Sequence, residues 1–179
     1  MAGSLKVLCM HGVGDHHTDS QWQESWRAAI LQGVHRWDPK KEVETEFVLY
    51  DRLFDQASLS LADTLNALRK LLGSGLRYGV EDLFGRRRGL GDLPDKLRWT
   101  AGMVVQWVEN DKLRAATRDL LWSAVQKQSP DVVLAHSLGS LVCYDTFLRS
   151  SPREALGETT FVSFGSQIGN PFVRASFGG

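Results

Sequence analysis

The sequence predicts an α/β domain whose mainly parallel sheet is flanked by helices. Patterns typical of strands alternate along the chain with amphipathic patterns typical of helices. This alternation implies right-handed crossover connections and a sheet that helices cover on both faces. The chain has 179 residues, of which 42% are hydrophobic, so it can bury the core of a single domain spanning residues 1–179. The expected strands are residues 5–10, 43–50, 131–135 and 159–164.

The first strand and its helix are the clearest of these elements. Residues 5–10 form a continuous apolar run, and the glycines of His11-Gly12-Val13-Gly14 allow the backbone to turn sharply after it. A helix should begin at Ser20, because Ser20 and Gln23 have the spacing of a capping box. Apolar residues then recur every four positions and predict a stripe that packs on the sheet, namely Trp22, Trp26, Ile30 and Val34.

The middle of the chain is less regular. The strand at 43–50 begins with alternating polar residues, which indicates a sheet edge. Leucines at helical spacing predict a helix over 61–72. The glycine-rich stretch that follows fits no long element, and we interpret 73–108 as a candidate cap or lid insertion. The end of this segment has helical periodicity, and Asp111 is expected to cap a further helix that Ser129-Pro130 ends. The apolar residues of these two helices are Trp99, Met103, Trp107, Leu113, Leu120, Leu121 and Ala124.

The overall composition argues against several classes of partner. Basic and acidic residues balance at 21 each, and the Arg86-Arg87-Arg88 run lies between glycines, as expected of a solvated loop. We therefore expect no nucleic acid to bind. No apolar stretch is long enough to span a membrane, and the amino terminus lacks a secretory pattern. Cys9 and Cys143 are expected to be reduced core residues, which suits a cytoplasmic protein.

One pentapeptide carries the clearest chemical signal. Ala135-His136-Ser137-Leu138-Gly139 follows an apolar strand and opens a helical pattern, and its small residues lie two before and two after the serine. Such a turn lifts a serine hydroxyl out of the sheet. A serine that attacks a carbonyl creates an oxyanion, and the N–H groups of Leu138 and Val13 are the natural pair to stabilise it. His11 is expected to brace the loop that carries Val13.

These segments resemble the α/β-hydrolase superfamily, specifically its lipase and esterase branch. The resemblance rests on the His-Gly-x-Gly loop at 11–14, on the nucleophile elbow at 135–139, with Ala135 in place of the usual glycine, and on Phe164-Gly165-Ser166. It implies a partial α/β-hydrolase fold and an acyl-enzyme on Ser137 that hydrolyses small-molecule or lipid esters without a cofactor. Gly12, Gly14 and His136 are then residues that support the site.

The chain departs from the family in its last part. The family places an acid and then a histidine after the nucleophile, but no histidine follows Ser137. The acidic residues after it are Asp145, Glu154 and Glu158, none of them in the expected loop. We therefore interpret the chain as the amino-terminal part of a longer hydrolase, one that turns over esters poorly by itself. Its uncovered sheet edge should lead it to associate with itself or leave it marginally stable.

Two other functional classes remain open. The cluster His11, Asp15 and His16 differs by one residue from a zinc-binding pattern of metallohydrolases. A zinc-dependent hydrolase is therefore a weaker alternative to the serine hydrolase, whose site is expected to hold no metal. A non-catalytic, hydrolase-like binding module would explain the missing base without truncation. A dinucleotide site is disfavoured because His17 stands where the third glycine of the Gly-x-Gly-x-x-Gly loop belongs.

Overall fold

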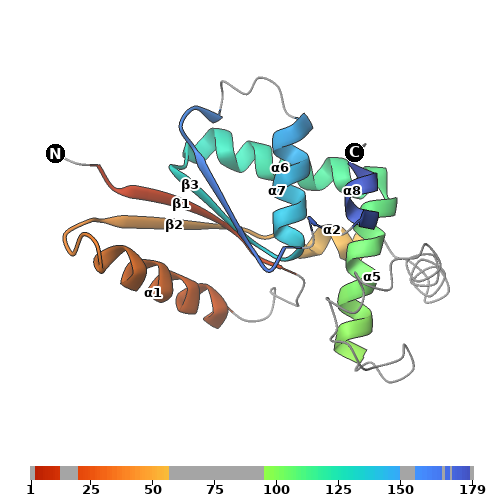
Figure 1. Ribbon diagram of the computed structural model, residues 1–179, viewed down its shortest axis with the longest axis horizontal. Coiled ribbons are helices and arrows are strands. Elements are labelled where there is room, and N and C mark those ends of the chain that lie inside the picture. Colours follow the sequence, from red (N-terminus) through yellow and green to blue (C-terminus); the bar gives the residue numbers. More distant parts are fainter. Residues whose placement is uncertain are drawn as a thin grey trace.

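The computed structural model describes residues 3–12, 20–56, 95–149, 156–166, 168–169 and 171–177. Its centre is a four-stranded sheet in the order β2-β1-β3-β4, in which every pairing is parallel (Figure 1). The strands are β1 (Leu5–Met10), β2 (Val43–Val48), β3 (Val132–His136) and β4 (Thr160–Phe164). The expected parallel α/β architecture is confirmed, with strand boundaries within two residues of those predicted.

Strand β2 lies at one edge of this sheet, as its half-polar sequence predicted. It ends at Val48, two residues earlier than expected, because the chain turns into a short helix, α2 (Asp51–Gln56), that the periodicity did not predict. Strand β4 lies at the other edge. Its sequence carries no charged residue, and Val162 and Phe164 are each 41% exposed. The edge formed by β2 is therefore half-polar, whereas the edge formed by β4 carries no charge.

Helix α1 (Gln21–His35) covers one face of the sheet (Figure 1). The rings of Trp22 and Trp26 pack against Phe47 of β2, so the predicted aromatic stripe does face the sheet. The predicted capping box is wrong, because Ser20 makes no side-chain cap and has helical backbone angles. Its carbonyl instead accepts from the N–H of Gln23 at 2.9 Å, and this backbone contact closes the first turn.

Helices α6 (Asp111–Gln128) and α7 (Leu138–Arg149) lie on the opposite face of the sheet from α1 (Figure 1). Asn110, rather than the expected Asp111, caps α6, because its Oδ1 accepts from the N–H of Leu113 at 3.0 Å. Leu120 is exposed, contrary to its expected place in the apolar stripe. The buried face of α6 instead follows a four-residue spacing, through Leu113, Thr117, Leu121 and Val125.

Helix α5 (Asp95–Glu109) connects part of the candidate cap segment to this core. Trp107 is fully buried and donates from Nε1 to Thr117 Oγ1 at 3.0 Å, which ties α5 to α6. Residues 102–108 are buried throughout. The earlier part of the segment, residues 73–94, and the helix expected at 61–72 lie outside the described residues. Within the described helices, none is both long and apolar enough to cross a membrane.

A buried carboxylate links the helices of this layer. Asp145 of α7 is fully buried and accepts from Arg114 at 2.6 Å, from Arg118 at 2.7 Å and from Arg149 at 2.9 Å. Arg114 also donates to the carbonyl of Ser176 at the end of α8 (Pro171–Ser176), at 3.2 Å. Burial opposes ionisation of Asp145, but the three guanidinium groups outweigh it and hold its pKa below the usual value.

Both cysteines are free and buried, as expected of reduced core residues. Burial raises the pKa of Cys9 to about 12, and it also raises that of Cys143. Neither thiol therefore forms a thiolate at neutral pH. Cys143 Sγ lies 3.7 Å from Met10 Sδ, so these side chains act as packing between α7 and β1.

Candidate active site

Ser137 occupies the turn between strand β3 and helix α7. Its φ angle is +51°, in the left-handed region that residues other than glycine rarely adopt. Backbone contacts hold this conformation: the N–H of Ser137 donates to the carbonyl of Phe164 at 3.1 Å, and its own carbonyl accepts from the N–H of Ser140 at 3.0 Å. The hydroxyl of Ser140 donates to the same carbonyl. Strain held in this way is typical of functional sites.

Small residues allow this turn to pack directly against strand β1. A Cβ atom added to Gly139 would lie 2.3 Å from the carbonyl oxygen of His11 and 2.8 Å from that of Met10. Ala135, at the other expected small position, is fully buried. The close approach of the elbow to β1 therefore requires glycine at position 139.

The loop after β1 reaches the serine itself. A Cβ atom added to Gly12 would lie 2.8 Å from Ser137 Cβ and 2.8 Å from His136 Nδ1. This contact follows from the sheet order, because β1 and β3 are parallel neighbours and their carboxyl ends meet at one edge. Gly12 and Ser137, which the sequence predicted to share a site, are thus in direct contact.

His136 fills the space between this loop and the end of β4. Its ring lies 4.9 Å from the ring of Phe164, and a Cβ atom added to Gly165 would lie 3.0 Å from His136 Nε2. Gly165 itself has a φ of +58°, which suits glycine. Burial lowers the pKa of His136, so its imidazole is neutral at pH 7. The supporting role of His136 stays a prediction.

His11 is buried beneath the same loop. Its Nδ1 lies 2.7 Å from the carbonyl oxygen of Gly12, and its Nε2 lies 3.5 Å from a carboxylate oxygen of Asp51. Its ring stacks on Tyr50 with centroids 4.4 Å apart, and Trp22 packs edge-on against it. These contacts fix the position of the His11 ring, and the role of His11 in bracing the loop that carries Val13 stays a prediction.

Tyr50 and Asp51 are site neighbours that the sequence analysis missed. Both are buried, and both directly follow β2, whose carboxyl end lies at the same edge of the sheet as Ser137. The rule that sites gather at the carboxyl ends of parallel strands was the signal that could have found them. The apolar residues around Tyr50 instead favoured a longer strand.

Leu138 begins helix α7, and its N–H is among the first in the helix, which have no acceptor within it. It therefore suits the predicted oxyanion role. The other predicted donor, Val13, lies outside the described residues, as do Gly14, Asp15, His16 and His17. Where the structure describes the chain, no group of three His, Cys, Asp or Glu side chains could hold a metal ion. Of the three residues of the zinc alternative, His11 is described, whereas Asp15 and His16 fall outside this part.

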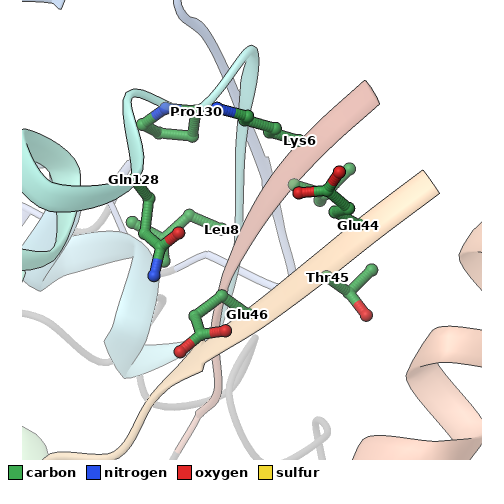
Figure 2. Close-up of a pocket in the computed structure, with 8 residues that line it drawn as sticks. Lys6, Leu8, Glu44, Thr45, Glu46, Gln128 and Pro130 are labelled. Carbon is green, nitrogen blue, oxygen red and sulfur yellow. The ribbon is translucent and has the colours of Figure 1, made fainter. Parts of the chain in front are cut away.

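A pocket on the sheet lies away from Ser137 and the residues around it. Figure 2 shows it between the first halves of β1 and β2 and the end of α6, whereas Ser137 follows the carboxyl end of β3. Its lining residues are Lys6, Val7, Leu8, Glu44, Thr45, Glu46, Gln128 and Pro130. This pocket therefore offers no room for a substrate at Ser137.

Comparison of the chain with protein-family models, with curated proteins and with solved structures finds no match.

Proposed function

We propose that this protein is a serine hydrolase that cleaves carboxylic esters through an acyl-enzyme on Ser137. The observation that carries the proposal is the left-handed backbone of Ser137 on a strand-to-helix turn, packed against Gly12. A plain turn could place a glycine or an asparagine there with less strain. The nucleophile elbow of serine hydrolases uses a strained turn of this kind to expose its hydroxyl.

The proposed reaction begins when Ser137 Oγ attacks the ester carbonyl carbon. A C–O bond forms, the hydroxyl proton passes to a base, and the carbonyl oxygen becomes an oxyanion. Collapse breaks the bond to the alcohol, which leaves with that proton, and a water molecule then releases the acid by the same steps. In this scheme the N–H of Leu138 at the start of α7 stabilises the negative charge that develops on the oxyanion, and the helix dipole adds to this stabilisation. The N–H of Val13 is the second donor that the sequence predicts.

The general base is the part of the proposal that the described contacts do not assign. Both ring nitrogens of His11 face other groups, the Gly12 carbonyl and Asp51. The ring of His136 packs between Gly12 and Gly165. His16 and His17 follow the same loop in the sequence and are the first residues to test.

A fluorophosphonate probe, which phosphonylates activated serines, tests the proposal on the full 179-residue chain. We expect a single adduct on the peptide containing Ser137 and none in Ser137→Ala. Ser123→Ala is the matched control, since it removes an exposed serine hydroxyl from α6. Hydrolysis of p-nitrophenyl acetate should likewise depend on Ser137, and a site without a complete triad can still retain roughly a thousandfold acceleration over water.

The proposal is rejected if Ser137→Ala keeps the wild-type hydrolysis rate or if the probe reacts elsewhere. The same experiment separates the hydrolase from a binding module. A module would bind an ester without acylation, so isothermal titration would detect binding while mass spectrometry found no adduct.

The variants His16→Ala and His17→Ala test whether either side chain accepts the serine proton, because loss of the base should slow acylation by about a hundredfold.

A further inference from the structure

Arginines outnumber acids where helix α6 meets helix α7. Arg114 and Arg118 lie one turn apart on α6, and Asp145 and Arg149 lie one turn apart on α7, so each pair shares a helix face. In the part of the chain that the structure describes, Asp145 is the only carboxylate that pairs with these arginines. Three guanidinium groups and one ionised carboxylate give this cluster a net charge of +2.

One of the three arginines is the buried counter-ion of Asp145. The side chain of Arg114 is only 7% exposed, and it contacts the carboxylate at 2.6 Å and the carbonyl of Ser176 at 3.2 Å. Burial alone would raise the pKa of Asp145, but the guanidinium groups hold it below its usual value, so this pair is ionised at neutral pH. Arg118 and Arg149 are 25% and 51% exposed, and the surplus positive charge therefore lies with them, at the surface.

The two exposed arginines keep donors that Asp145 does not use. Arg118 donates to Asp145 from Nη1 at 2.7 Å, and Arg149 donates from Nε at 2.9 Å. A guanidinium group carries five N–H donors, and none of the described residues accepts from those that remain on Arg118 and Arg149. Because both groups contact the same carboxylate, they are neighbours. Two cations side by side repel each other, so an anion that bridges them would stabilise the pair.

We propose that Arg118 and Arg149 form a binding site for a phosphate dianion, either free phosphate or a phosphomonoester, on the surface between α6 and α7. A phosphate group carries nearly two negative charges at neutral pH, which matches the surplus of the cluster, whereas a carboxylate would neutralise half of it. Guanidinium groups also suit phosphate, because their planar edges donate two parallel hydrogen bonds to its oxygens.

This site is separate from the candidate active site. Ser137 directly precedes α7, whereas Arg149 is the last residue of that helix. The inference therefore goes beyond the proposed ester hydrolysis and does not depend on it. Ser137→Ala should bind phosphate with the affinity of the wild type.

Isothermal titration of the full 179-residue chain with inorganic phosphate tests the site, in a slightly alkaline, low-salt buffer that keeps phosphate a dianion. We expect a saturable dissociation constant of about 1 mM. Arg149→Gln should weaken binding at least about tenfold, and Arg118→Gln likewise, because each variant removes a charge-assisted contact. Both variants keep Arg114 on Asp145. Arg36→Gln is the matched control, since it removes an exposed arginine at the end of α1, across the sheet, and it should leave the affinity unchanged.

Nuclear magnetic resonance of the wild type locates the bound ion. Phosphate should shift the backbone amide resonances next to Arg118 and Arg149 and leave those of α1 in place. Methyl phosphate distinguishes the two sources of the ligand. If it shifts the same resonances, the site accepts a phosphomonoester, and if only inorganic phosphate does so, the ligand is the free ion. Acetate, with one charge, should bind more weakly than either.

Three results would overturn the inference. The first is a wild type that shows no saturable binding of phosphate. The second is an equal loss of affinity in Arg36→Gln and Arg149→Gln, because it would indicate general attraction to a positive surface. The third is a shift confined to the resonances around Leu138, which would place the ion at the proposed oxyanion site instead. The resonance experiment uses the wild type, so it tests the site even if a variant fails to fold.

Discussion

Gly139→Ala should destabilise the protein, although alanine ordinarily stabilises a helix relative to glycine. The new methyl group would meet the His11 carbonyl oxygen at 2.3 Å and the Met10 carbonyl oxygen at 2.8 Å. Both are backbone atoms of β1 or the loop after it, so neither can rotate away, and α7 must shift relative to the sheet. Overpacking of this kind costs about 1–3 kcal/mol, and the helix preference for alanine offsets at most about 1 kcal/mol.

We therefore expect the free energy of unfolding of Gly139→Ala to fall by about 1–2 kcal/mol, measured by urea denaturation followed by far-ultraviolet circular dichroism. Gly33→Ala is the matched control, since Gly33 also lies in a helix but a Cβ atom there has no neighbour within 4 Å. That variant should gain about 0.5–1 kcal/mol. The reasoning is refuted if Gly139→Ala is as stable as the wild type, or if the two variants change in the same direction.

The remaining predictions concern the buried carboxylate and the uncharged sheet edge. Asp145→Asn should cost about 3 kcal/mol in urea denaturation, because it leaves the buried guanidinium of Arg114 without its anion. The folded-state pKa of Asp145 is depressed, so its contribution to stability is present above about pH 4 and is lost as the pH falls further. The wild-type and Asp145→Asn stabilities should therefore converge in acid, and a constant difference down to pH 2 would contradict this assignment. Strand β4 should pair with its counterpart in a second copy, because an uncharged edge strand offers free backbone groups. Val162→Lys should then lower the mean mass in light scattering, and a wild type that is monomeric at every concentration would rule this out.

The fold was largely predictable because its signals are local. An apolar run, a glycine turn and a four-residue aromatic stripe each depend on neighbours within one element, and they correctly predicted β1, α1 and β3. The wrong predictions concern the first turns of α1 and α6, where backbone and side-chain acceptors compete for the same N–H groups. Ser20 has the right spacing for a capping box, yet a backbone carbonyl closes the turn instead. Asn110 caps α6 one residue before the expected Asp111 because its side chain reaches the free N–H of Leu113.

The sequence by itself identified Ser137 as the candidate nucleophile and showed the small residues around it. It also showed the alternation of strands and helices from which a parallel sheet follows. Only the tertiary structure decided which strands are neighbours, and therefore that Gly12 touches Ser137. It also decided that Tyr50 donates to a carbonyl 39 residues away, and that Asp145 meets Arg114 across 31 residues. Periodicity shows which face of an element is buried, but the partner of a buried polar group depends on strand order and helix packing, which no local pattern encodes.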